Sequence, residues 1–210
     1  INIVIPEGIE RIDNYAFSSC PYLKSVTISE GVKEIGWAAF EKATLETVNI
    51  PSSVKRIETY AFNECRELKN VTILEGVNEI GYSAFAATAL ETVYIPSSVK
   101  SIEEYAFCEC RELKDVTISE GVEHIGMLAF NNCQNIGDVQ IPASVKKIDA
   151  YAFNLCWYWN EGTIKFIRKT DFEYDNSMLW NDNRVSILIP IDAKENYTNY
   201  CLLYTSDAAD

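Results

Sequence analysis

The sequence predicts a mainly β repeat protein in which short copies of one motif stack into a solenoid. The dipeptide Ala-Phe recurs seven times, with successive phenylalanines 22 or 23 residues apart. Columns of Val and Ile keep the same step, and these residue types suit strands. One copy cannot bury its own apolar side chains, so stacked copies must bury a continuous core together. The repeating phenylalanines are Phe17, Phe40, Phe62, Phe85, Phe107, Phe130 and Phe153.

Each copy contains one predicted strand, because its last two apolar positions alternate with polar ones, as in Val71-x-Ile73. The strand stops at Pro51, Pro96 and Pro142 in odd copies and at a Glu-Gly step in even copies. A second short extended piece, such as residues 54–57, is expected on the opposite side. The Ala-Phe-x-x-Cys segment that follows is too short for more than a helical turn.

The copies alternate in type, which gives a second and longer period. Odd copies carry Tyr-Ala-Phe, whereas even copies carry Glu-Gly-Val and, a few residues later, Ile-Gly. The true unit is therefore close to a pair of copies about 45 residues long.

The full pattern is Leu-x-x-Val-x-Ile-Pro-x-x-Val-x-x-Ile-x-x-x-Ala-Phe-x-x-Cys, as at residues 45–65. It resembles the BspA-type (Treponema-type) leucine-rich repeat family over about residues 3–166. The resemblance implies a right-handed leucine-rich-repeat solenoid with a parallel sheet on its concave side. It also implies a bacterial protein that is secreted or on the cell surface, because the family is found mostly there. Several members are associated with adhesion to host proteins or other cells.

Three regions are expected along the chain. Residues 1–166 form the solenoid, and residues 167–200 form a degenerate last repeat and C-terminal cap, with a strand at 185–190 and a short helix at 193–200. Residues 201–210 resemble a translated sequencing adapter and are left out of the fold prediction. The first residue is Ile1, and no signal peptide or N-terminal cap is visible, so we expect the chain to be a fragment.

Composition excludes several classes of function. The net charge of −13 disfavours nucleic-acid binding, which needs clustered Lys and Arg. No apolar run is long enough for a membrane helix. A single histidine, His124, leaves little room for proton-transfer or metal chemistry. We expect a monomer with no catalytic residues, no metal and no cofactor.

The cysteines occupy a repeated position three residues after the column Phe. Ala43 and Thr88 fill that position in two other copies, which indicates a small buried slot. A bridge from Cys133 to either Cys110 or Cys156 in the neighbouring copies stays open. The cysteines in this slot are Cys20, Cys65, Cys110, Cys133 and Cys156.

Charged residues also follow the repeat, in two columns of alternating sign. Stacking would place opposite charges about 4.8 Å apart in each column. We interpret both columns as devices for register and solubility, and His124 as an ordinary member of the second, solvated column. The columns read Lys24, Glu46, Lys69, Glu91, Lys114 and Arg11, Glu34, Arg56, Glu79.

The outward positions of the concave sheet are the best candidates for ligand binding. They are polar, mostly uncharged, and include one aromatic residue, a type favoured as an interface anchor. This face predicts a non-enzymatic protein-binding or adhesion module whose partner is a protein or glycan on host or other cells. The alternative is a plain solvated sheet in a passive spacer that displays other domains of a larger surface protein. The candidate binding residues are Thr27, Asn49, Thr72, Tyr94, Thr117, Gln140, Asn70 and Asp115, and the row of the last two also contains Ser25, Thr47, Thr92 and Asp138.

Overall fold

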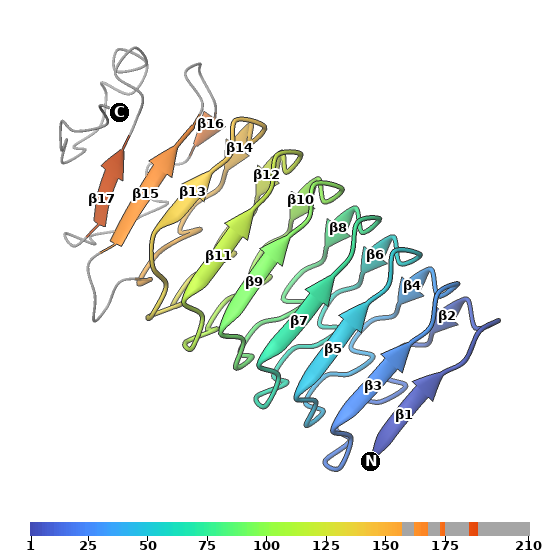
Figure 1. Cartoon of the computed structure of the whole chain (residues 1–210). Coiled ribbons are helices and arrows are strands. Elements are labelled where there is room, and N and C mark those ends of the chain that lie inside the picture. Colours follow the sequence, from blue (N-terminus) through green and yellow to red (C-terminus); the bar gives the residue numbers. More distant parts are fainter. Residues whose placement is uncertain (157–161, 168–172, 175–184, 189–210) are drawn as a thin grey trace.

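The computed structural model describes residues 1–156, 162–167, 173–174 and 185–188. They form a β-solenoid in which each turn of the chain adds one strand to a front sheet and a shorter strand to a back sheet (Figure 1). All strand pairs are parallel, as the predicted stacking requires. The mainly β repeat fold and its step of about 23 residues are thus confirmed.

The front sheet has six strands, and a further three strands continue the same side of the solenoid as a separate sheet. The back sheet consists of two-residue strands. The front strands are β1 (Asn2–Ile5), β3 (Ser25–Ile28), β5 (Thr47–Ile50), β7 (Asn70–Ile73), β9 (Thr92–Ile95) and β11 (Asp115–Ile118), followed by β13 (Val139–Ile141), β15 (Gly162–Phe166) and β17 (Val185–Leu188). The back strands are β2 (Arg11–Ile12), β4 (Glu34–Ile35), β6 (Arg56–Ile57), β8 (Glu79–Ile80), β10 (Ser101–Ile102), β12 (His124–Ile125), β14 (Lys147–Ile148) and β16 (Glu173–Tyr174).

The strand register reproduces the sequence columns. Val48 pairs with Val71, and Ile50 pairs with Ile73, so identical positions of successive copies lie side by side. The strand predicted at 185–190 is present as β17 over Val185–Leu188. The helix predicted at 193–200 and the tail at 201–210 lie outside the described residues. Within the described segments, no helix is long and apolar enough to cross a membrane.

The segment around Ala-Phe forms tight turns in place of the predicted helical turn. Ala16 N donates to Asp13 O, and Ser18 N donates to Tyr15 O, so each bond closes a four-residue turn. Tyr15 and Ser19 have φ of 58° and 54°, a left-handed conformation uncommon for residues other than glycine. Bonds to the next copy fix this backbone, since Tyr15 N donates to Trp37 O and Phe17 N to Ala39 O.

The repeating phenylalanines form one stacked column through the core. Neighbouring rings have centroids 5.1–5.4 Å apart and planes within 10° of parallel. Six of the seven are completely buried, and Phe17 at the first copy is partly buried. Such offset stacking adds to the free energy of burying the rings. Each copy therefore stabilises its neighbours on both sides through the same side chain.

A glutamate clamp explains why the copies alternate. The Glu30 carboxylate accepts hydrogen bonds from the backbone amides of Ser52 and Ser53, 3.1 and 3.0 Å away, in the next copy. The Ser53 hydroxyl in turn donates to Val32 O and accepts from Gly31 N. The Glu-Gly of an even copy thus needs the Pro-x-Ser of the following odd copy. The clamp repeats at Glu75 with Ser97 and Ser98, and at Glu120 with Ala143 and Ser144.

The charged columns lie as predicted, at opposite-charge spacing. Arg11 pairs in register with Glu34 in the back sheet, and Arg56 pairs with Glu79. Their nitrogen and oxygen atoms are 3.2 and 2.9 Å apart. The arginines are about half exposed and the glutamates about a third exposed, so solvent screens each pair and its contribution to stability is under about 1 kcal/mol.

Candidate functional site

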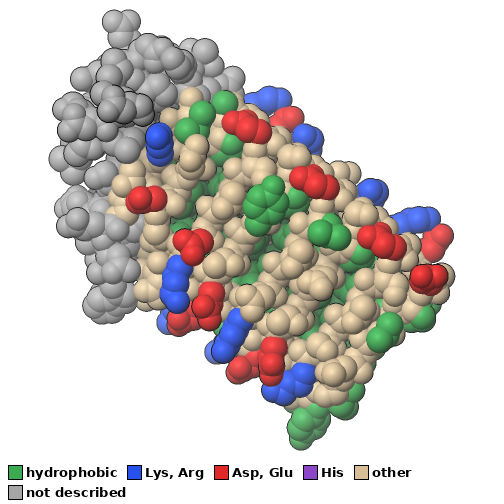
Figure 2. Space-filling view, viewed as in Figure 1, with side chains coloured by type: hydrophobic (Ala, Val, Ile, Leu, Met, Phe, Trp, Pro, Cys, Tyr) green, Lys and Arg blue, Asp and Glu red, His purple; other side chains and the backbone are tan. Residues whose placement is uncertain are grey.

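The strand face, which we define as the outward-facing residues of β3, β5, β7, β9, β11 and β13, holds all the predicted binding residues. Along β5, β9 and β11, outward residues are exposed while their neighbours are buried, as the alternation predicts, and β3 and β7 depart from this only at Ser25 and Val71, which are partly buried. Tyr94 is the largest exposed side chain among the predicted residues, at 54% exposure. Figure 2 shows that the middle of this side of the molecule is largely uncharged and that charged side chains gather along its two borders.

The register brings several predicted residues together. Thr27 pairs with Asn49, and Asn49 with Thr72, which gives three polar neighbours in one row. Tyr94 pairs with Thr117 one pair of copies further along. Within the described part of the chain, none of the eight predicted side chains makes a hydrogen bond or ion pair. Their polar groups are therefore free to bind an external partner.

The predicted parallel sheet divides at one place. Gln140 lies on β13, which pairs with β15 and has no paired residue on β11. Lys165, on β15, pairs with Gln140 and extends the row of outward residues, as Val4 does at the other end. Both were missed because the repeat columns used for the prediction were not extended to these outer strands.

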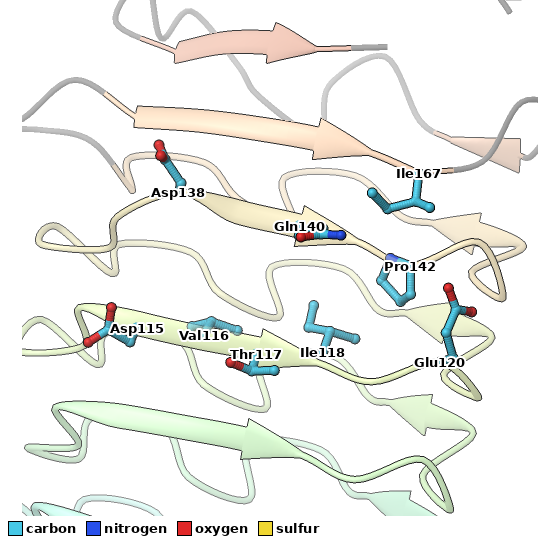
Figure 3. Close-up of a pocket in the computed structure, with 9 residues that line it drawn as sticks. All are labelled: Asp115, Val116, Thr117, Ile118, Glu120, Asp138, Gln140, Pro142 and Ile167. Carbon is cyan, nitrogen blue, oxygen red and sulfur yellow. The ribbon is translucent and has the colours of Figure 1, made fainter. Parts of the chain in front are cut away.

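A hollow of about 430 Å³ opens on the strand face where the sheet divides (Figure 3). Its lining comes from β11, from β13 and the residues that flank it, from Glu120, and from Ile167 after β15. Three predicted residues, Asp115, Thr117 and Gln140, contribute to it. The hollow could not be predicted from the repeat pattern, because it depends on the missing pairing between β11 and β13.

The repeated cysteine slot is buried, as predicted, and also polar in its contacts. Cys65 Sγ donates to Phe40 O over 3.0 Å, and Cys110, Cys133 and Cys156 make the same bond to the second phenylalanine before them. Burial raises the pKa of the Cys65 thiol to about 12. The six cysteines that the structure describes are all free thiols, so Cys133 is bridged to neither Cys110 nor Cys156. Such thiols pack as small side chains and are poor nucleophiles.

His124 is partly buried rather than freely solvated. Its Nε2 lies 2.7 Å from Asp149 Oδ2, and its Nδ1 lies 3.3 Å from Ser101 Oγ. The Ser101 hydroxyl donates to the Glu103 carboxylate, so its proton is already engaged. Burial opposes ionisation of Asp149, but hydrogen bonds from Lys147 and His124 outweigh it and lower the pKa of Asp149. The cluster joins three successive copies at the position where the charged column stops alternating.

An aromatic ladder crosses the turns that precede the phenylalanine column, and the prediction missed it. Successive ring centroids are 4.6–6.2 Å apart. In even copies the aromatic residue stands one position earlier than in odd copies, which hides the column in the sequence. The rings are tilted or edge-on to one another and so present no common flat surface. The ladder consists of Tyr15, Trp37, Tyr60, Tyr82 and Tyr105.

Among the described residues, no group of three or more His, Cys, Asp or Glu side chains is placed to hold a metal ion. The repeated turn, the parallel sheets and the stacked phenylalanines define a leucine-rich-repeat solenoid, a fold that typically serves as a non-enzymatic scaffold. The chain belongs to the family of the BspA type leucine rich repeat region, which matches residues 1–107 and 78–201 in six copies.

Solved structures share this fold. A leucine-rich repeat protein from Eubacterium ventriosum is 27% identical over 72% of this chain, with a TM-score of 0.66. The T. pallidum leucine rich repeat protein is 24% identical over 83% of this chain and 72% of its own, with a TM-score of 0.61. A leucine rich cell surface protein from Faecalibacterium prausnitzii is 27% identical over 78% of this chain, with a TM-score of 0.48. No curated protein matches the chain significantly.

The chain is shorter than two of these relatives. It spans 42% of the Eubacterium ventriosum chain and 53% of the Faecalibacterium prausnitzii chain.

Proposed function

We propose that this chain is a non-enzymatic protein-binding or adhesion module of a bacterial cell-surface or secreted protein, and that it binds through the strand face. The observation that carries the proposal is the contrast between this face and its borders. Charged side chains at the borders are paired with one another, as in Lys24 with Glu46. The polar side chains of the face itself have no partner within the described segments.

Tyr94 is the expected anchor of the interface. It projects from β9, the fifth of the six strands of the front sheet, and pairs with Thr117. Its ring is half exposed in a face otherwise made of small polar groups, and buried aromatic rings commonly dominate binding energy at protein interfaces. The neighbouring threonines and Asn49 would contribute hydrogen bonds and shape complementarity.

The family to which the chain belongs supports a surface or extracellular location. The partner class that suits an uncharged polar face with one aromatic anchor is a protein or glycan on host or other cells. The alternative function is a passive spacer that displays other domains of a larger surface protein.

The test measures binding of the chain to a panel of immobilised extracellular-matrix proteins by surface plasmon resonance. Tyr94→Ala is expected to weaken binding about tenfold or more, and Asn49→Ala less. Tyr22→Ala is the matched control, because Tyr22 is 72% exposed but lies in a turn away from the strand face. Unchanged binding in both face variants would overturn the role of this face. No binding to any protein of the panel would favour the spacer.

A further inference from the structure

We call the line between two adjacent front strands a seam, strong where four residues are paired across it and weak where fewer are. Strong and weak seams alternate, and the number of paired residues at the weak seams falls along the chain. The front strand of each odd copy (β1, β5 and β9) has four residues paired with the front strand of the even copy that follows (β3, β7 and β11). The front strand of each even copy has fewer residues paired with that of the next odd copy. There are three paired residues from β3 to β5, one from β7 to β9, and none from β11 to β13.

Proline explains the alternation. After the front strand of an even copy the chain continues with a residue such as Ser119, which follows β11. Its backbone amide donates to Ile95 O at the end of β9 over 3.1 Å. After the front strand of an odd copy the equivalent position is proline, as at Pro142 after β13, and proline has no amide proton to donate. Each seam between an even copy and the odd copy that follows it therefore lacks one hydrogen bond at its end.

The last weak seam differs from the others in having an aspartate on each of its two sides. Asp115 and Asp138 occupy equivalent positions, each three residues before the isoleucine that ends its repeat strand. Earlier copies have uncharged residues there, for example Asn70 and Thr92. Like charges on neighbouring strands disfavour close pairing, and Figure 3 shows the Asp138 carboxylate directed toward β15 and away from Asp115. The Thr163 amide donates to Asp138 Oδ1 and satisfies one oxygen, whereas Asp115 makes no ion pair or hydrogen bond through its side chain in the described structure.

Apolar side chains lie beneath the carboxylates. Val116 and Ile118 on β11 line the hollow and are each 7% exposed, much as the equivalent Val26 and Ile28 on β3 are, at 5% and 6%. The hollow of about 430 Å³ thus has an apolar floor and an acidic rim, as Figure 3 shows for Asp115 and Asp138 at one end. Its volume lies in the range of about 300–1,000 Å³ typical of small binding sites. None of the described residues that line it is Lys, Arg or His.

We propose that this hollow receives a lysine or arginine side chain of the partner protein. Such a side chain has an apolar stem and a cationic end, which match the floor and the rim. The stem would lie along Val116 and Ile118, and the cation would lie between Asp115 and Asp138, where it relieves their repulsion. Gln140 adds a side-chain oxygen that accepts from the same donor. The inference rests on the proposed function, since it names the partner chemistry of one part of the strand face.

The experiment uses a tetra-arginine peptide as the probe, with tetraglutamate as the control peptide. Binding to the full chain is followed by titration and by the amide NMR signals of β11 and β13. The test variant is Asp115→Asn with Asp138→Asn, which keeps the side-chain shapes. The matched variant is Glu7→Gln with Glu67→Gln, which removes the same charge from exposed residues outside the hollow. Thermal unfolding verifies that both variants are folded.

We expect tetra-arginine to shift the amide signals of β11 and β13 and the hollow variant to bind at least about tenfold more weakly. The matched variant is expected to bind within about twofold of the wild type. Equal loss in both variants would show general attraction to an acidic protein and overturn the inference. Saturable shifts of the same signals by calcium chloride alone, without competition from the peptide, would overturn it in favour of a cation site.

The outcome separates this inference from the proposed function. If Tyr94→Ala abolishes binding to a matrix protein while the hollow variant binds that protein normally, the proposed function stands and the hollow inference fails. If the hollow binds tetra-arginine but no matrix protein is bound, the hollow inference stands and the proposed function fails.

Discussion

The carboxylate of Glu75 accepts hydrogen bonds from both the backbone amide and the hydroxyl of Ser97, each 3.1 Å long. The backbone amide of Ser97 is the main cause of a lowered pKa at Glu75. The bond crosses the seam from the fourth to the fifth copy, which in the front sheet keeps a single paired residue. A side chain thus replaces part of the backbone pairing that proline removes.

Substitution of this glutamate is expected to loosen the seam. Glu75→Ala leaves two backbone amides of the next copy without their acceptor, a loss similar in kind to that of a helix cap. We expect the Tm from circular dichroism to fall by about 2–4 °C. Glu67→Ala is the control, because Glu67 is exposed and makes no such bond in the described structure. An equal fall in both variants would contradict a clamp.

Stability is expected to fall in acid. The pKa of Glu46 is lowered by Lys24, and the pKa of Glu123 is lowered by Lys146. A group with a depressed pKa in the folded state contributes stability above its unfolded pKa and loses it as the pH falls. Glu79, whose pKa burial raises, works in the opposite direction but stands alone among these glutamates. Thermal unfolding at constant ionic strength should show the Tm falling between about pH 5 and pH 3. A Tm that does not change over this range would contradict the prediction.

Two glycines at equivalent positions should respond differently to alanine. Gly31 and Gly76 both have left-handed φ, at 105° and 130°. A methyl group on Gly31 meets nothing within 4 Å, whereas one on Gly76 lies 2.0 Å from Ser52 O. Gly31→Ala therefore costs only backbone strain, about 1–2 kcal/mol. Gly76→Ala adds a clash with backbone and should lower the free energy of unfolding by more than about 3 kcal/mol in urea titrations. Similar losses in the two variants would argue against this local geometry.

The phenylalanine column should show an end effect. Phe85 is fully buried between two rings, so Phe85→Ala is expected to cost about 3–5 kcal/mol in the free energy of unfolding. Phe17 has a ring on one side only and is partly buried. Phe17→Ala should therefore cost clearly less in the same urea titration. A larger effect at Phe17 would be inconsistent with stacking as the source of stability.

The buried thiols should resist alkylation. Burial holds the pKa of Cys65 and Cys110 far above the ordinary value, so almost no thiolate is present at pH 8. Cys20 is only partly buried. Iodoacetamide labelling followed by peptide mass spectrometry should modify Cys20 at least about tenfold faster than Cys65. In urea the difference should vanish, and persistence there would contradict burial as its cause.

The features that depend on repeated side chains could be predicted from the sequence. The spacing of Phe62 and Phe85 predicts the core column, and the polar positions at Asn49 and Tyr94 predict the exposed row. The features that depend on backbone geometry could not. Left-handed turns at residues such as Tyr60 leave no compositional sign, because Ala, Ser and Leu occupy the same position elsewhere. The missing pairing between β11 and β13 could not be predicted either, because both strands keep the repeat pattern of their paired counterparts.

The glutamate clamp sets the unit in which this protein can lengthen or shorten. Each clamp joins an even copy to the odd copy after it, so duplication or loss of a pair of copies leaves every clamp complete. Gain or loss of a single copy places two copies of the same type next to each other. A glutamate would then meet another Glu-Gly step instead of Pro-x-Ser, and its carboxylate would lose both amide donors. Recombination between the repeats is therefore constrained to steps of about 45 residues, twice the step of a single strand.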